Sequence, residues 1–155
     1  MTTDSMITLV GTVVTVISMF ITIWQVTKAK NYREQIKFDI RKINLASCAE
    51  RLRRAQDDIR RLPLSTTSIP RGVRVSELIL SIKAHFDYSI GAINSQGPDN
   101  DIRGILTNAQ KKLNDYEVGF NSQTINHADV HELQSLIQDS ISTSNSRIFE
   151  LEGKA

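Results

Sequence analysis

The 155-residue chain has one cysteine, three prolines and 6% aromatic residues. These scarcities argue against disulfides, against frequent breaks in helices and against a surface for stacking bases. The single cysteine, Cys48, cannot form an intrachain disulfide, so we expect it to be a small buried apolar residue. The chain has no glycine-rich phosphate loop, no Ser or Cys nucleophile motif and no paired-carboxylate signature. The sequence therefore indicates no enzyme activity and no cofactor.

Charge is absent from one long stretch near the amino terminus. Residues 6–26 contain no charged side chain over twenty-one positions. At about 1.5 Å per residue, a helix of this length crosses a hydrocarbon core of roughly 30 Å. The stretch is too long for a signal peptide, has no basic region before it and no small-residue cleavage site after it. Residues 6–26 are therefore predicted to be one transmembrane helix.

Positive charge is concentrated directly after this stretch. Residues 28–62 hold eleven Lys or Arg against five Asp or Glu, a net charge of +6, whereas only Asp4 precedes the stretch. The positive-inside rule then predicts a protein of the inner (cytoplasmic) membrane, with the amino terminus outside and a basic juxtamembrane neck over residues 27–37. Four neck residues are predicted to contact anionic lipid headgroups. They are Lys28, Lys30, Arg33 and Lys37.

Glycine and proline are both absent from residues 12–62, which favours helix almost throughout. Asn31 and Glu34 have the spacing of a capping box, so a restart near residue 31 is an alternative to the favoured continuous helix. An apolar 3–4 repeat follows, which either packs into the chain's own bundle or joins subunits as a coiled coil. Its members are Phe38, Arg41, Leu45, Cys48, Leu52, Ala55, Ile59 and Leu62. Three isoleucines, Ile36, Ile40 and Ile43, are expected to widen this apolar face.

Three more amphipathic segments follow Pro63, at 75–93, 101–120 and 127–151. Each is predicted to be a helix with one apolar stripe. Asn126 is the expected N-cap of the last helix, with Asp129 in the capping-box position, and residues 140–146 form a serine-rich polar patch. The fold class is therefore all-α: a single N-terminal transmembrane helix followed by a cytoplasmic four-helix bundle over residues 31–151.

Small and polar residues gather on one side of the predicted transmembrane helix. At 100° per residue they occupy an arc of roughly 140°, whereas the bulkier apolar side chains point the other way. Small residues let membrane helices approach closely, so this polar arc is a candidate self-association or pore face. Alternatively, the hydroxyls bond only to carbonyls of their own helix. The polar arc consists of Thr8, Gly11, Thr12, Thr15, Ser18, Thr22 and Gln25.

A group of arginines in the predicted bundle is the candidate contact for nucleic acid or a partner protein. Its members are Arg51, Arg53, Arg54, Arg60 and Arg61. No aromatic platform for stacking bases accompanies them, so nucleic acid is the less favoured partner. Asp57 and Asp58 lie one turn from Arg53 and Arg54, where surface ion pairs are expected. His127 and His131 are also one turn apart, but a zinc site needs a third ligand, and we expect no metal site.

The whole plan resembles the small single-pass membrane effectors of prokaryotic antiphage defence. It is most similar to the membrane accessory protein of type VI, RNA-targeting CRISPR systems. The resemblance implies an oligomeric, pore-forming protein with a bundle related to HEPN ribonuclease domains. HEPN ribonucleases carry Arg followed four to six residues later by His. No Arg stands at that distance before His85, His127 or His131, which argues against ribonuclease activity.

Three functions are compatible with this sequence. The first is a homo-oligomer that permeabilises or depolarises the membrane in antiviral defence, serving a cytoplasmic protein or an RNA-guided effector. The second is a membrane-anchored adaptor that recruits a cytoplasmic partner without forming a pore. The third, ranked last, is an anchored HEPN-type ribonuclease. The oligomeric state in detergent separates the first two, because a monomer favours the adaptor.

Overall fold

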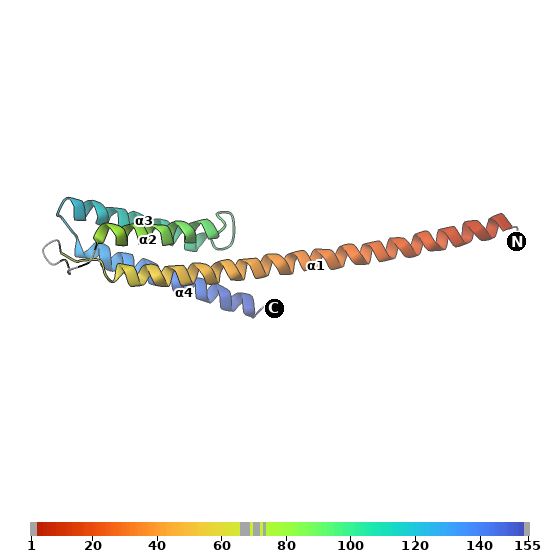
Figure 1. Cartoon of the computed structure of the whole chain (residues 1–155). Helices are drawn as coiled ribbons and strands as arrows, with labels where there is room; N and C mark the ends of the chain where they lie inside the picture. The colour runs from red at the N-terminus through yellow and green to blue at the C-terminus, as the bar shows by residue number, and fades with distance from the viewer. Residues whose placement is uncertain (1–2, 66–68, 70–71, 73, 154–155) are drawn as a thin grey trace. The chain divides into compact units, whose positions relative to one another are not determined.

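The computed structural model describes residues 3–65, 69, 72 and 74–153, with side chains from Leu9 onward (Figure 1). It contains four helices and, among these residues, no strand, which confirms the all-α fold class. The chain divides into two compact units, Met1–Ile40 and Arg41–Ala155. The helices are α1 (Thr3–Ile59), α2 (Val75–Ala92), α3 (Asn100–Asn121) and α4 (His127–Glu152).

The first helix, α1, runs without interruption for 57 residues. The predicted continuity is confirmed, and the capping-box spacing at Asn31 does not restart the helix. The physical reason is that no residue after Gly11 breaks the backbone ladder or removes an N–H donor. After Ile59 the backbone closes a tighter turn, in which the Leu62 N–H donates to the Ile59 carbonyl at 3.1 Å. Pro63 then prevents further helix.

Polar contacts between helices establish the direction of each helix in the second unit. Ser47 of α1 lies 3.1 Å from the Tyr88 hydroxyl of α2, and Ser81 of α2 donates to Asp58 of α1 at 2.8 Å. Residue numbers rise along α1 as they fall along α2, so the two helices are antiparallel. The other neighbouring helices are antiparallel by the same test. The pairs Gln110–Asp87 and Lys83–Glu117 join α2 to α3, and Lys112–Glu132 and Arg147–Asp101 join α3 to α4. The pairs Gln56–Gln138 and Lys42–Glu152 join α1 to α4. The unit is therefore an up-down-up-down four-helix bundle.

The predicted apolar repeat of α1 forms the first wall of the bundle core. Leu52, Ala55 and Ile59 are completely buried, and Leu45 and Leu62 nearly so. This stripe packs inside the chain's own bundle, which settles the choice between a bundle core and a coiled coil between subunits. The other three helices contribute Val75, Ile79, Ile82, Phe86, Ile102, Leu106, Ala109, Leu113, Tyr116, Val130, Leu133, Ile137, Ile141 and Leu151.

The charged exception in the repeat, Arg41, has a buried partner. Its guanidinium forms two hydrogen bonds with the Asp99 carboxylate, from Nε at 2.7 Å and from Nη2 at 2.6 Å. Asp99 is only 7% exposed and lies directly before α3. The carboxylate raises the pKa of Arg41, against the opposing effect of burial. A bidentate pair thus fastens the α2–α3 connection to α1.

Three isoleucines of α1 lie outside the core, contrary to expectation. Ile36, Ile40 and Ile43 are 56%, 52% and 66% exposed. The physical reason is angular, since at 100° per residue they project roughly 140° away from the centre of the buried stripe. They form a separate apolar line on the opposite side of α1, and do not widen the core face.

Small polar side chains occupy part of the bundle core. Cys48, Ser89, Ser140 and Ser144 are all 0% exposed. Ser140 and Ser144 donate to backbone carbonyls four residues earlier, at 2.9 and 2.8 Å, which satisfies their hydroxyls in place. The serine-rich stretch 140–146 therefore contributes to the core, and α4 runs through it unbroken. Burial raises the pKa of the Cys48 thiol, so Cys48 is the inert apolar residue that was expected.

A side chain caps the start of α4, and another bonds to the chain that leaves α1. Asn126 caps α4 as predicted, accepting from the Ala128 N–H at 3.1 Å. Asp129 does not complete a capping box, and instead lies 3.6 Å from Lys112 of α3. The buried Tyr116 hydroxyl donates to the Pro63 carbonyl at 2.8 Å, which ties the chain leaving α1 to α3. Desolvation raises the pKa of Tyr116 to about 12.

Replacing Leu52 tests this core. Leu52→Ala should lower the free energy of unfolding by about 2–5 kcal/mol, through lost burial plus a cavity. Leu52→Lys should prevent the 28–155 fragment from folding, because no partner can reach a charge at that site. Chemical denaturation followed by circular dichroism measures both changes. The matched control is Ile43→Lys on the exposed side of α1, which should change stability by less than about 0.5 kcal/mol. A stable, helical Leu52→Lys fragment would contradict the core described here.

Removing Arg41 tests the buried ion pair. Arg41→Met leaves the Asp99 carboxylate buried without its charged partner, and should cost about 2–3 kcal/mol in the same denaturation assay. Lys42→Met is the control, because Lys42 and Glu152 are each nearly half exposed and their pair should contribute less than about 1 kcal/mol. If the two variants lose equal free energy of unfolding, the Arg41–Asp99 pair stabilises the bundle no more than an exposed ion pair does.

Candidate functional site

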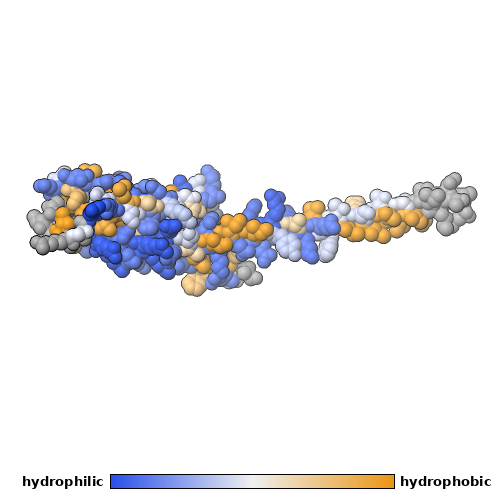
Figure 2. Space-filling view, in the orientation of Figure 1, coloured by the Kyte–Doolittle hydropathy of each residue, from blue (hydrophilic) through white to orange (hydrophobic). Residues whose placement is uncertain are grey.

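One helix of the described chain, α1, is long and apolar enough to cross a membrane. None of the apolar part of this helix is buried within the structure. Its largest side chains are far from covered, with Phe20 and Trp24 being 69% and 62% exposed. Since the backbone N–H and C=O groups pair inside the helix, the surroundings meet mainly its side chains, of which the large ones are apolar. Figure 2 shows them as orange atoms along one side of the extended part of α1, with paler atoms along the other.

The hydroxyls of the polar arc are bonded within their own helix. Thr15 donates to the Gly11 carbonyl, Ser18 to the Val14 carbonyl and Thr22 to the Ser18 carbonyl, each at 2.8 Å. The Thr8 side chain lies outside the described residues. These bonds lower the cost of placing the hydroxyls in hydrocarbon. The polarity of the arc therefore does not by itself require a partner, and its small residue volume is the remaining signal for close helix contact.

Gly11 and Gln25 are the first and last members of the polar arc whose surroundings the structure describes, and both are exposed. No atom lies within 4 Å of the position that a Cβ on Gly11 would occupy, so this side of the helix is open to a neighbour. Gln25 is exposed at the other end, one residue after Trp24. The arc is thus uncovered along its whole described length.

Aromatic and basic side chains mark the end of the apolar stretch. The Lys28 ammonium lies 4.8 Å from the centroid of the Trp24 ring, a cation–π contact. Tryptophan followed by lysine is typical of the membrane–water boundary. The four predicted headgroup contacts, Lys28, Lys30, Arg33 and Lys37, are all exposed. None of the four forms an ion pair with a described residue, so their charges are available to anionic lipid.

The arginines of the second unit do not form one free basic surface. Arg51 stacks over the Tyr88 ring at 4.7 Å, Arg54 pairs with Glu50 at 3.3 Å, and Arg60 pairs with Asp57 at 3.4 Å. The expected pairs of Arg53 with Asp57 and Arg54 with Asp58 are absent among the described residues. The physical reason is orientation, because an acid one turn before a base is the favoured arrangement on a helix, and both observed pairs follow it.

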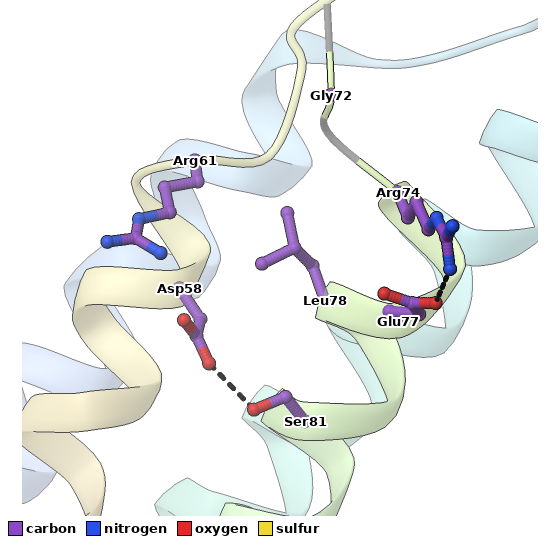
Figure 3. Close-up of a pocket in the computed structure, with 7 residues that line it drawn as sticks. All are labelled: Asp58, Arg61, Gly72, Arg74, Glu77, Leu78 and Ser81. Atoms are coloured by element: carbon purple, nitrogen blue, oxygen red, sulfur yellow. Dashed lines mark hydrogen bonds and ion pairs between the residues drawn. The ribbon is translucent and has the colours of Figure 1, made fainter.

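A shallow pocket lies beside the end of α1 (Figure 3). It has a volume of about 270 Å³ and is lined by Asp58, Arg61, Gly72, Arg74, Glu77, Leu78 and Ser81. Its acids are already engaged, since Glu77 pairs with Arg74 at 2.7 Å and Asp58 accepts from Ser81. Arg61 is the one lining arginine without an ion pair among the described residues. Ser81 and Asp58 are the one hydroxyl and its carboxylate partner in the lining, and no histidine or cysteine lies among the lining residues.

The histidines provide no alternative chemistry in the part of the chain that the structure describes. His127 and His131 are exposed in the first turns of α4, and His85 is half-buried on α2. No group of three or more metal-ligating side chains occurs among the described residues. The residues that sequence patterns did not identify are Tyr88, which holds Arg51, and Asp99, which holds Arg41.

The structure thus concentrates its distinctive features in α1, where an exposed apolar span with a polar arc is followed by basic residues that form no ion pair with a described residue. In comparisons with protein-family models, curated proteins and solved structures, nothing matches this chain.

Proposed function

We propose that the protein is a single-pass membrane protein anchored by residues 6–26 of α1. The observation that carries this proposal is the complete exposure of the apolar part of α1. Leaving Val13, Ile17 and Phe20 in water costs about 1.5–3 kcal/mol for each side chain, whereas lipid removes that cost. The Trp24–Lys28 contact supports a boundary at this end of the span.

The proposed orientation places the amino terminus outside and the bundle in the cytoplasm, at the inner (cytoplasmic) membrane. The unpaired Lys28, Lys30, Arg33 and Lys37 support it, because basic flanks remain on the cytoplasmic side. The chain has a single, buried cysteine, Cys48, and this scarcity is compatible with a reducing compartment.

The proposed activity is self-association through the polar arc, with permeabilisation or depolarisation of the membrane in bacterial antiviral defence. Exposure of the arc and the open space beside Gly11 support close approach of a second helix. The defence setting, the HEPN-like character of the bundle, and a cytoplasmic or RNA-guided effector partner rest on the resemblance of the overall plan.

An anchored adaptor is the second candidate function, and a specific observation favours it. The hydroxyls of Thr15, Ser18 and Thr22 are satisfied inside their own helix, so a lone anchor pays little for them in lipid. In this case α1 only localises the bundle, and the bundle surface recruits the partner.

Topology is tested with a reporter fused after Ala155. The reporter should be active only in its cytoplasmic form, and neutral replacement of Lys28, Lys30, Arg33 and Lys37 should mix the two orientations. Neutral replacement of Arg53 and Arg61, which lie in the folded bundle, is the control and should leave topology unchanged. A carboxyl terminus outside the cytoplasm in the unaltered protein would overturn the proposed localisation.

Two triple variants, each of which introduces three leucines into the apolar span, distinguish a pore from an adaptor. Thr12→Leu, Thr15→Leu and Thr22→Leu together should disrupt the oligomer or stop ion flow, because the arc loses its small volume and polarity, even though membrane insertion improves. Val13→Leu, Ile17→Leu and Ile21→Leu is the matched control on the apolar side, and should change little. The readouts are the mass of the detergent-solubilised protein and a membrane-potential dye. If both triple variants behave like the unaltered protein, the adaptor replaces the pore.

A further inference from the structure

The polar arc shares its helical spacing with an apolar stripe that begins in the neck and ends at Ile40. Tyr32, Ile36 and Ile40 of α1 are 58%, 56% and 52% exposed, on three successive turns. At 100° per residue the three fall within roughly 80° and overlap the direction of the polar arc. One 4–3 repeat joins the two regions without interruption and runs through Gly11, Thr15, Ser18, Thr22, Gln25, Ala29, Tyr32 and Ile36. Ile40 follows after four more residues.

A repeat of this kind is the pattern of a helix that packs against another helix along its whole length. Within the first unit the structure leaves every described member of it exposed. The polar arc and the apolar stripe differ in the size and polarity of their side chains, and each kind of side chain suits helix contact in a different solvent. Small residues suit contact between helices in lipid, where apolar side chains gain nothing from association. Large apolar residues suit contact in water, where burial is the driving force.

We propose that Tyr32, Ile36 and Ile40 pack in parallel against the same residues of a second copy of this chain, as a coiled coil that continues the membrane interface. This inference deepens the proposed self-association and rests on it. Copies anchored by the same span lie parallel and at the same depth in the membrane. The stripe of one copy therefore lies at the same height as the stripe of the other.

Charge beside the stripe supports a second copy as the occupant. Lys37 lies on one flank of the stripe and Asp39 on the other, both exposed and without an ion pair among the described residues. When two parallel copies face each other about a two-fold axis, the Lys37 flank of one lies beside the Asp39 flank of the other. Opposite charges then meet on both sides of the seam. A lipid surface would attract Lys37 but repel Asp39.

Disulfide crosslinking of the full chain in membranes tests the seam. Ile36→Cys and Ile40→Cys should give dimer under mild oxidation, at a yield at least about fivefold above that of Glu34→Cys, which lies on the other side of the helix at the same height. The native Cys48 is fully buried and should not contribute, which the unaltered protein verifies. Equal yields at residues 34 and 36 would overturn the proposal.

Charge exchange separates a second copy from a lipid surface. Lys37→Asp and Asp39→Lys should each lower the crosslinking yield of Ile36→Cys severalfold, and the two together should restore it, because the pair forms again with its charges exchanged. If the stripe instead lies on anionic lipid, Asp39→Lys alone should raise binding to phosphatidylserine vesicles and leave crosslinking unchanged. That result would overturn the coiled coil.

Failure of this inference is distinguishable from failure of the proposed function. A further variant, Gly11→Cys, places a cysteine on the polar arc and reports contact between the membrane spans. If Ile36→Asn with Ile40→Asn leaves both the detergent-solubilised mass and the crosslinking yield of Gly11→Cys unchanged, the coiled coil is wrong and the membrane interface stands. If the unaltered protein is a monomer and no cysteine variant crosslinks, both are wrong.

Discussion

The backbone hydrogen bonds inside α1 are the constraint on which the rest of the structure depends. A helix pairs its N–H and C=O groups within itself, so one segment can enter hydrocarbon without help from any neighbour. The same property allows the helix to continue into water with no change of conformation. In α1 the absence of glycine and proline after Gly11 keeps this ladder intact to Ile59. The side chains alone then decide which surroundings each part of the helix prefers.

Those side chains change their pattern around Arg41. Before it, most of the large apolar residues of the helix are exposed, as Phe20, Trp24 and Ile36 show. After it, the large apolar residues from Leu45 to Leu62 lie on one stripe and are buried by three other helices of the same chain, whereas Ile43 stays exposed. Arg41 itself belongs to that stripe by spacing, and Asp99 makes its charge tolerable there. The same helix thus contributes an exposed apolar span and one wall of a buried core.

Local features of this fold could be predicted from sequence, because local chemistry determines them. Breaker positions and apolar periodicity give α2, α3 and α4 to within about one residue and α1 to within about three, and the buried stripe of α1 follows from its 3–4 spacing. The partner of Arg41 could not be predicted, since Asp99 is 58 residues away and many acids compete for such a role. Surface pairs also escaped prediction, because alternatives such as Glu50 and Asp58 for Arg54 differ by only a few tenths of a kcal/mol.

Burial was predicted least well where polarity and size disagree. Ser140 and Ser144 are polar, yet they are buried because they are small and bond to their own helix. Ile36 and Ile40 are apolar, yet they are exposed because they lie on the far side of α1 from the core stripe. The candidate site depended on a continuous pattern in α1, which the sequence shows. Its activity has no motif in the sequence, and so could not be predicted.

The antiparallel order of the bundle has a mechanical consequence. Lys42 of α1 and Glu152 of α4 are 2.7 Å apart, so the chain enters and leaves the bundle at the same end. A pulling force applied between these two points would peel α4 from α1 one contact at a time, beginning at this exposed pair. Helices pulled from opposite ends must instead slide past each other and break many contacts together. The bundle is therefore expected to open at low force when the load acts between Lys42 and Glu152.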